Sequence, residues 1–209
     1  MPMPSQADLD AMWRPAMALI LASAVIMGSP GPSTISATAV AASYGLRRSL
    51  GYAGGLVAGT VAVLLGVEAG VAAVLLAIPH GGSVLSAVSA VYILWLAYRV
   101  ATAPPLAGPH DAVAAPAFTG GFVLALANPK AWLAIAAVVS GTRLLDDDPA
   151  LDALAKTLLL GAMIVVIHLG WLLAGASLSR VLRDPRGSRI MNLVLAAALA
   201  VTPFIALLH

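Results

Sequence analysis

The stretch Gly28-Ser29-Pro30-Gly31-Pro32-Ser33 interrupts an apolar run that extends from about Ala16 to Tyr44. Its two prolines lack an amide proton and clash with the preceding turn, so a regular helix cannot continue through them. A second interruption, Asn128-Pro129-Lys130, lies within another apolar run 99 residues later, close to half of the 209-residue chain. Backbone groups freed inside a bilayer are tolerated only where protein or a polar cavity receives them. Two broken helices at matching positions in two halves are typical of a secondary transporter.

The composition places the chain in a membrane. Hydrophobic residues make up 61% of it and charged residues 10%, whereas soluble domains have about 45–50% apolar and about 25% charged residues. The mean hydropathy is +0.98. The net charge of +2 is spread between apolar runs, so no nucleic-acid partner is indicated. The chain has no cysteine, which excludes thiol chemistry, disulfides and thiolate metal sites.

Apolar runs of about 20 residues predict membrane-spanning helices. We expect an all-α, polytopic membrane protein with about six transmembrane helices in a single domain, residues 1–209, surrounded by lipid. Three helices in each half would give two inverted repeats, at about residues 13–103 and 115–209. The six runs lie near Pro15–Tyr44, Leu50–Ile78, Ser83–Val100, Ala117–Thr142, Leu151–Leu178 and Arg189–Leu208.

The basic residues predict an orientation, because short cytoplasmic loops are enriched in lysine and arginine. The connectors after the first, third and fifth runs hold most of them, which places these connectors in the cytoplasm and both termini outside it. The residues on this side are Arg47, Arg48, Arg99, Arg180, Arg183, Arg186 and Arg189; those on the other side are Arg14, Arg143 and Lys156.

The first interruption predicts an anion site. The half-helix that starts near Ser33 presents unpaired N–H groups and the positive end of its dipole near the middle of the membrane. The hydroxyls of Ser33 and Thr34 surround that end, and a carboxylate would bind well there. The alternative is a proline kink that only shapes helix packing.

The second interruption adds a charge and an amide. Lys130 is the only lysine within an apolar core of the sequence, and a charge inside the membrane by default marks a substrate or ion path. The amide of Asn128 can cap the broken end. The alternative is that Lys130 snorkels to the nearer interface, but it lies about ten residues into the run, roughly 15 Å at 1.5 Å per residue.

Small residues form a stripe on the second run. Such a stripe lets another helix approach closely, either within the chain or in a homo-oligomer. Glu68 lies on the opposite side of this helix, where we expect it to face a polar cavity or a partner such as Lys130. The glycines of the stripe are Gly51, Gly55, Gly59, Gly66 and Gly70.

His168 lies in the fifth run. A histidine titrates near neutral pH and could carry protons, so we take His168 and Glu68 as candidates for ion coupling; the alternative for His168 is a hydrogen-bonded packing residue. The sequence has no phosphate-binding loop, no hydrolase motif and no pair of histidines at ligand spacing. We therefore expect no enzymatic activity, no cofactor and no metal site.

Several segments together resemble the LysE/RhtB family of amino-acid exporters. Pro30-Gly31-Pro32-Ser33 with Tyr44-Gly45-Leu46-Arg47-Arg48-Ser49-Leu50-Gly51 resembles its N-terminal signature, and Val91-Tyr92-Ile93-Leu94-Trp95-Leu96-Ala97-Tyr98-Arg99 resembles the end of its third helix. Phe118-Thr119-Gly120-Gly121-Phe122, continuing to Asn128-Pro129-Lys130-Ala131, resembles its third signature. The resemblance implies a bacterial inner-membrane secondary exporter of amino acids or related small zwitterions, driven by a proton or ion gradient.

Two positions depart from the family. Thr60 stands where many relatives have aspartate, and Ala97 stands where glycine is usual. If that aspartate contributes to coupling or binding in relatives, Glu68 is the candidate to replace it here.

We expect the substrate to bind between the two interruptions. Its carboxylate would meet the half-helix at Ser33 and Lys130, and its amino group would meet freed carbonyls at Pro30–Gly31 and Asn128, or Glu68. The residues expected to bind substrate are Pro30, Gly31, Pro32, Ser33, Thr34, Asn128, Pro129 and Lys130. Two other functions stay open: export of an inorganic cation, as in distant members of the same superfamily, and a membrane scaffold that transports nothing.

Overall fold

The structure is a computed structural model that describes residues 6–103, 114–145, 148–181 and 185–207. Within these ranges the chain forms helices and no strand, as the sequence predicts. The predicted location of the two termini concerns residues 1–5 and 208–209, which lie outside the described ranges. The helices are α1 (Gln6–Ile26), α2 (Pro32–Tyr44), α3 (Leu46–Glu68), α4 (Val71–Ala77), α5 (Gly81–Ala101), α6 (Phe118–Ala127), α7 (Pro129–Ser140), α8 (Pro149–Val181) and α9 (Pro185–Leu207).

Both predicted helix breaks are confirmed. The first lies between α1 and α2, and the second separates α6 from α7 with a bend of 62°. In each case the second helix begins at a proline, Pro32 or Pro129, because the first turn of a helix needs no amide proton from that residue. The 10 residues of α6 and 12 residues of α7 are about 15 and 18 Å long. The second break therefore divides a span of about 30 Å near its middle.

The second apolar run is longer than one membrane span needs, and it forms two helices rather than one. α3 ends at Glu68, and Gly70 takes a left-handed conformation with φ of +77° before α4 begins. Glycine reaches this region at no steric cost, so the chain turns sharply here. The run near Leu50–Ile78 is thus a full-length helix followed by a short one.

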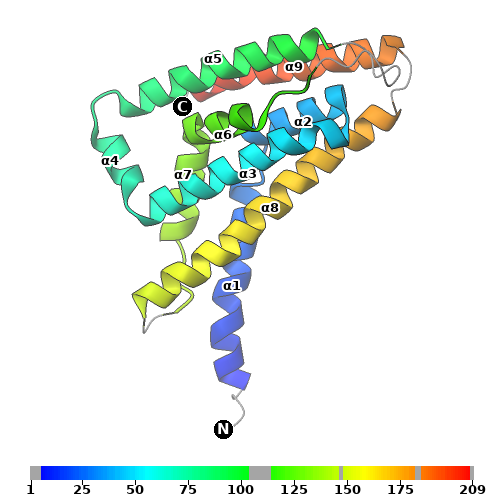
Figure 1. The fold of residues 1–209 in the computed structure, drawn as a ribbon. Helices are drawn as coiled ribbons and strands as arrows, with labels where there is room; N and C mark the ends of the chain where they lie inside the picture. Colours follow the sequence, from blue (N-terminus) through cyan, green and yellow to red (C-terminus); the bar gives the residue numbers. More distant parts are fainter. Residues whose placement is uncertain (1–5, 104–113, 146–147, 182–184, 208–209) are drawn as a thin grey trace.

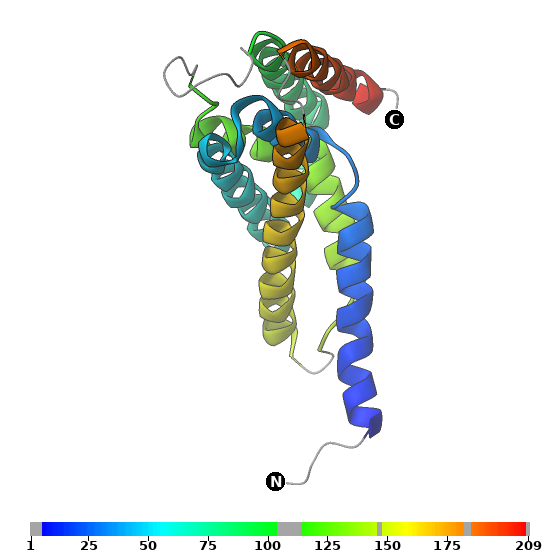
Figure 2. The ribbon, with the colours of Figure 1, turned by 90° about the vertical axis from the view of Figure 1, so that its right-hand side faces the viewer.

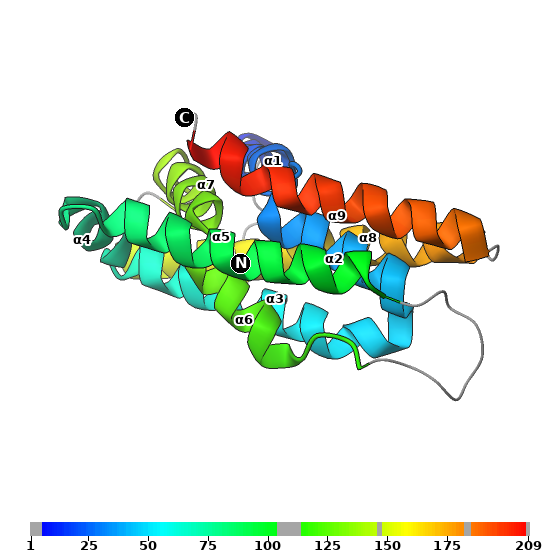
Figure 3. The ribbon, with the colours of Figure 1, turned by 90° about the horizontal axis from the view of Figure 1, so that it is seen from above.

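The ends of several helices gather on one side of the molecule. α2, α5 and α8 end at the right of Figure 1, where α3 and α9 begin, and Figure 3 shows the same grouping from above. α5 and α9 lie side by side and antiparallel across the other helices, whereas α1 runs beside α7 and α8 (Figure 2). Arg47, Arg48, Arg99 and Arg189 belong to the gathered ends, so these four of the basic residues behind the predicted orientation share one end of the fold.

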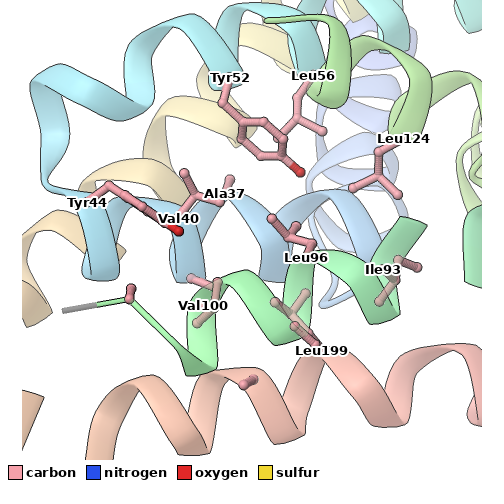
Figure 4. Close-up of a cluster of buried hydrophobic side chains, with 14 of the residues drawn as sticks. Ala37, Val40, Tyr44, Tyr52, Leu56, Ile93, Leu96, Val100, Leu124 and Leu199 are labelled. Carbon is pink, nitrogen blue, oxygen red and sulfur yellow. The ribbon is translucent and has the colours of Figure 1, made fainter. Parts of the chain in front are cut away.

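The core is built around α2. This helix consists mainly of alanine, serine and threonine, and ten of its 13 residues are buried. Its small side chains allow α3, α5, α8 and α9 to contact it. Figure 4 shows part of the resulting cluster, in which Val40 of α2 lies near Tyr52 and Leu56 of α3, Leu96 of α5 and Leu199 of α9.

The outer surface is strongly apolar. Large hydrophobic side chains of α5 and α8 are widely exposed, including Val91 at 71% and Leu158 at 66%. Among the described residues, three helices are long and apolar enough to cross a bilayer, and the broken pair α6–α7 makes a fourth if it is counted as one span. These are Leu46–Glu68, Ser83–Ala101 and Pro149–Leu178, with Phe118–Ala127 plus Pro129–Ser140. The chain is a multi-pass membrane protein, while the expected number of six spans stays a prediction.

The two halves have a similar order of elements. Each contains a broken pair, then a long helix, then a final helix: α1–α2, α3 and α5 in the first half, and α6–α7, α8 and α9 in the second. Only the first half has an additional short helix, α4. The inverted relation between the halves stays a prediction.

Candidate functional site

The two breaks meet at one cavity. Its walls come from the end of α1, the first turns of α2 and α7, the middle of α3 and one face of α8. The polar lining residues are Ser29, Gly31, Ser33, Thr34, Thr60, Asn128, Lys130 and His168, and the apolar ones are Met27, Ala131, Ala134, Ile135, Ile164 and Ile167. The cavity thus has polar groups on a largely apolar wall, and freed backbone groups at membrane depth are tolerated where they are enclosed by protein in this way.

Lys130 links the second break to the first. Its ammonium Nζ donates to the carbonyl O of Ser29 at 2.7 Å, to Ser29 Oγ at 2.8 Å and to the carbonyl O of Pro30 at 2.8 Å. An ammonium has three protons, so these contacts use all of them. Gly31 makes room for this side chain, since a Cβ there would lie 2.7 Å from Lys130 Cδ. The prolines of the first break thus free the carbonyls, and Lys130 binds them.

Asn128 makes a second link between the breaks. Its side chain is 3% exposed, and its Nδ2 donates to Ser33 Oγ at 3.0 Å. Its Oδ1 accepts from the backbone N–H of Lys130 at 3.2 Å and so caps α7. The amide therefore fixes the start of α7 against the start of α2.

The N-terminus of α2 faces the cavity with free donors. The first backbone bond of this helix is donated by Ile35 N–H to the carbonyl of Gly31, so the N–H groups of Ser33 and Thr34 have no helical acceptor. The N–H of Gly31 donates to Thr34 Oγ1 at 2.8 Å. These groups and the helix dipole make this end of the cavity attractive for an anion.

α8 closes the cavity opposite the breaks. Trp171 Nε1 donates to the carbonyl of Gly28 at 3.0 Å, a further carbonyl freed by the first break. Thr38 Oγ1 donates to the carbonyl of Trp171, 3.0 Å away. Close to this point, a Cβ on Gly175 would lie 2.8 Å from Cα and the carbonyl carbon of Thr38 and closer still to its carbonyl O, so a glycine is needed for α2 and α8 to touch.

His168 is buried on the cavity side of α8. It is 5% exposed, and its Nδ1 lies 2.8 Å from the carbonyl O of Ile164. Because a carbonyl can only accept, this geometry assigns the imidazole proton to Nδ1. His168 Nε2 is buried and has no hydrogen-bond partner. In the neutral ring this nitrogen is an acceptor with a free lone pair.

The cavity contains most of the residues that the sequence predicts for substrate binding. Gly31, Ser33, Thr34, Asn128 and Lys130 line it. The three prolines act differently: Pro30 gives its carbonyl to Lys130, and the other two, Pro32 and Pro129, start the second helix of each pair.

One part of the expected geometry changes. We expected freed carbonyls of the first break to receive the amino group of a substrate. The carbonyls of Ser29 and Pro30 instead bind the ammonium of Lys130. A lysine at the second break reaches them because Gly31 leaves the space for its side chain open.

Glu68 lies outside this cavity, so the expected partnership with Lys130 is wrong. Glu68 is the last residue of α3 and interacts electrostatically with Lys156 and Asp152 near the start of α8. Lys156 and Asp152 form an ion pair of 2.8 Å, and each residue is 7% exposed. The sequence interpretation of Lys130 as the only lysine in an apolar core is therefore also wrong.

Asp152 also holds the chain between α7 and α8. Its Oδ1 accepts from the backbone N–H groups of Leu144 and Leu145, at 2.7 and 3.1 Å. Lys156 Nζ donates in turn to the carbonyl of Val139, at 3.3 Å. This ion pair is thus a structural clamp at the far end of α7.

The glycines of α3 do not form a single contact. Gly55 and Gly59 lie against the backbone of α6, and Gly66 lies against the ring of Trp132. An added Cβ would have no neighbour within 4 Å at Gly51 or Gly70. Gly51 is exposed and Gly70 ends the helix through its positive φ, so the stripe we predicted is shorter than its sequence pattern.

Two polar lining residues were not predicted as site residues, Ser29 and Thr60. Ser29 lies inside the first break and supplies two of the three oxygens for Lys130, and its position beside Pro30 is the signal that could have identified it. Thr60 lines the cavity from α3 and donates to the carbonyl of Leu56 at 2.8 Å. Its departure from the family pattern is the signal in that case.

The cavity is narrow in this conformation. The space between its walls is about 40 Å³, room for about three water molecules at most. An amino acid is larger, so its binding requires the walls to move apart. Lys130 and Asn128 hold the two breaks together, and these links are the ones that a bound ligand would have to replace.

The sequence pattern of the LysE type translocator family matches residues 24–207. The chain is 34% identical over 174 residues to the cysteine/O-acetylserine efflux protein of Escherichia coli strain K12. These 174 residues cover 82% of this chain and 86% of the relative. The protein of that name in Shigella flexneri gives the same values, and that of Escherichia coli O1:K1 is 33% identical over the same length. No solved structure matches. Translocators and efflux proteins are transporters rather than enzymes, and this chain belongs to the LysE type translocator family.

Proposed function

We propose that this protein is a secondary-active exporter of amino acids or closely related small metabolites across the bacterial inner membrane. The observation that carries the proposal is the contact of Lys130, from one broken helix, with the carbonyls of the other inside a shared cavity. Both breaks expose backbone groups here, and secondary transporters bind substrates at such discontinuous helices. The relatives named cysteine/O-acetylserine efflux proteins support small amino acids as the substrate class.

The donors of the cavity suit a carboxylate. The N–H groups of Ser33 and Thr34, the amide of Asn128 and the ammonium of Lys130 lie around one space. A carboxylate is a stronger acceptor for an ammonium than a carbonyl is, because its bonds are charge-assisted on both sides. A substrate carboxylate would therefore compete with Ser29 and Pro30 for Lys130.

This competition gives alternating access a physical basis. Lys130 joins the two breaks while the cavity holds no substrate, and the joined state leaves only about 40 Å³ of space. When a carboxylate takes over the ammonium, the two broken helices lose a direct link and can move relative to each other. We propose that this movement exposes the cavity to one side of the membrane and then to the other.

The test is transport by the purified protein in liposomes. We would load the vesicles with unlabelled amino acid and measure the counterflow of labelled L-cysteine, O-acetyl-L-serine and a panel of other amino acids. Lys130→Met keeps most of the length of the side chain and removes its charge. A hydrogen bond to a charged group contributes about 1.5–3 kcal/mol, so we expect about 10- to 100-fold weaker substrate affinity.

The controls separate loss of binding from loss of folding. Lys130→Met should remain monodisperse in detergent, and Lys130→Arg should retain part of the activity because it keeps the charge. If the wild type exchanges no amino acid, the proposed substrate class is wrong. Undiminished exchange by Lys130→Met would remove Lys130 from the site, and stabilisation of the wild type by metal ions would favour a cation exporter.

A further inference from the structure

His168 is the unpaired acceptor of the cavity. Its Nε2 is buried without a hydrogen-bond partner, and His168 is 5% exposed. The buried unpaired side-chain atoms elsewhere in the described residues belong to Tyr52, Glu68, Ser89 and Tyr92, and none of these residues lines the cavity. A buried acceptor without a donor costs about 1–3 kcal/mol, so a ligand that brings a donor is favoured here.

The other acceptors at the first break already have donors. The carbonyls of Ser29 and Pro30 accept from Lys130, and that of Gly28 accepts from Trp171. Thr34 Oγ1 accepts from the N–H of Gly31. An α-ammonium group that enters the cavity would therefore find in His168 Nε2 a buried acceptor that needs no exchange of partners.

We propose that His168 Nε2 binds either the ammonium group of the substrate or a proton, and that this exclusive choice couples export to proton entry. The inference rests on the proposed function, since it gives that site its coupling group. Nδ1 donates to Ile164 in both forms of the ring. The second proton can attach only to the Nε2 lone pair, which is the atom that would accept from the substrate.

Each cycle carries one zwitterion out and one proton in, so every proton is accounted for and one positive charge moves inward. After the substrate leaves on the outer side, a proton from that side binds Nε2. It is released to the cytoplasm before the next ammonium group binds there. A protonated His168 would also place a second positive charge in the cavity that holds Lys130. Two positive charges in a site of low polarity oppose the binding of a third, the ammonium group of the substrate.

No other titratable residue competes within the cavity. Among its lining residues, Lys130 and His168 are the ones whose side chains titrate between a charged and a neutral form. α8 packs against α1, α2 and α3. Among the side chains that the structure describes, the titratable or charged groups of these three helices lie outside the lining, as do those of α8 other than His168. They are Arg14 on α1, Tyr44 on α2, Arg47, Arg48, Tyr52 and Glu68 on α3, and Asp152 and Lys156 on α8.

The test compares His168→Gln with His80→Gln. Glutamine keeps an acceptor at similar reach and takes no proton in this range. His80 is exposed in the turn before α5 and is absent from the cavity lining, so it controls for the chemistry of the substitution. The probe is labelled L-cysteine, kept reduced, between about pH 5.5 and 7.5, where its ammonium, carboxylate and thiol hold their charge.

We expect three results from purified protein. The dissociation constant of the wild type should rise as pH falls, approaching about tenfold per pH unit once His168 is protonated, whereas that of His168→Gln should stay constant. Counterflow without a gradient should be weaker but still measurable in His168→Gln, because glutamine keeps an acceptor for the substrate. Uptake driven by a pH gradient should be lost in His168→Gln and retained in His80→Gln.

The outcomes separate the two proposals. Gradient-driven uptake by His168→Gln at the wild-type rate would overturn the role of His168 and leave the proposed function intact. If that variant does not fold, the wild type alone still gives a test. A wild-type affinity for L-cysteine that is constant from about pH 7.5 to 5.5 would also overturn the role of His168. A wild type that shows neither binding nor counterflow would end the proposed function, and the coupling role with it.

Discussion

The contact between α3 and α6 should be sensitive to a single methyl group at Gly55. A Cβ there would lie 2.8 Å from the carbonyl carbon of Phe118 and 2.9 Å from the backbone N of Phe122, and closer still to the carbonyl O of Phe118. These neighbours are backbone atoms of a helix and cannot rotate away. Ordinary contact begins at 3.4 Å, so the helices must separate by at least 0.6 Å.

This separation sets the expected cost of Gly55→Ala. A gap of about 0.5–1 Å loses a quarter to a half of the attraction between the atoms that face it. Overpacking of this kind costs about 1–3 kcal/mol. For a chain of this size we expect the midpoint of thermal unfolding to fall by roughly 2–12 °C.

Gly51→Ala is the matched control. Gly51 lies one turn earlier on the same helix, is exposed, and has no atom within 4 Å of an added Cβ. Alanine favours a helix over glycine by up to about 1 kcal/mol, so this variant should be as stable as the wild type or more stable.

Tryptophan fluorescence of the purified protein can follow unfolding, since the chain contains four tryptophans and no cysteine for thiol-reactive dyes. Equal unfolding midpoints for Gly55→Ala and Gly51→Ala would refute the close approach of α3 and α6. A loss of stability in Gly55→Ala that leaves counterflow unchanged would place the contact outside the moving parts of the transporter.

Two further substitutions test contacts that the sequence does not reveal. Trp171→Phe removes the donor for the carbonyl of Gly28 and should cost about 1 kcal/mol, measured as a lower unfolding midpoint with the protein still monodisperse; an unchanged midpoint would mean that this bond contributes nothing. Asp152→Asn weakens the ion pair with Lys156 and should lower the unfolding midpoint clearly. Asp148→Asn, at an exposed cap of the same helix, should lower the midpoint less. A larger loss in Asp148→Asn than in Asp152→Asn would contradict the structural role of the ion pair.

The local rules of the sequence were sufficient for the helices and their breaks. Proline has no amide proton and restricts the chain next to it, so both breaks could be placed to within a few residues. Composition alone identified a membrane protein, since a soluble chain could not cover so much apolar surface. The prediction failed at residues 69–70, because a single glycine that turns the chain has no distinct pattern within an apolar run.

Within the candidate site, the sequence could supply the residue types but not their partners. Ser33, Asn128 and Lys130 were identified because polar groups beside prolines in an apolar run need a cavity. Their contacts could not be predicted, since Lys130 and Ser29 are 101 residues apart. The same limit applied to Glu68, whose angular position on α3 is known from periodicity while the helix that covers it is not.

The sequence by itself determined where the helices stop, that they lie in a membrane, and which side chains are too polar to face lipid. These properties follow from backbone chemistry and hydration, which act on each segment separately. Only the tertiary structure decided that Lys130 occupies the carbonyls of the first break and that Nε2 of His168 remains unpaired. Those facts depend on the packing of α2, α7 and α8 against one another, and a hydrogen bond forms only when distant segments bring donor and acceptor within about 3 Å.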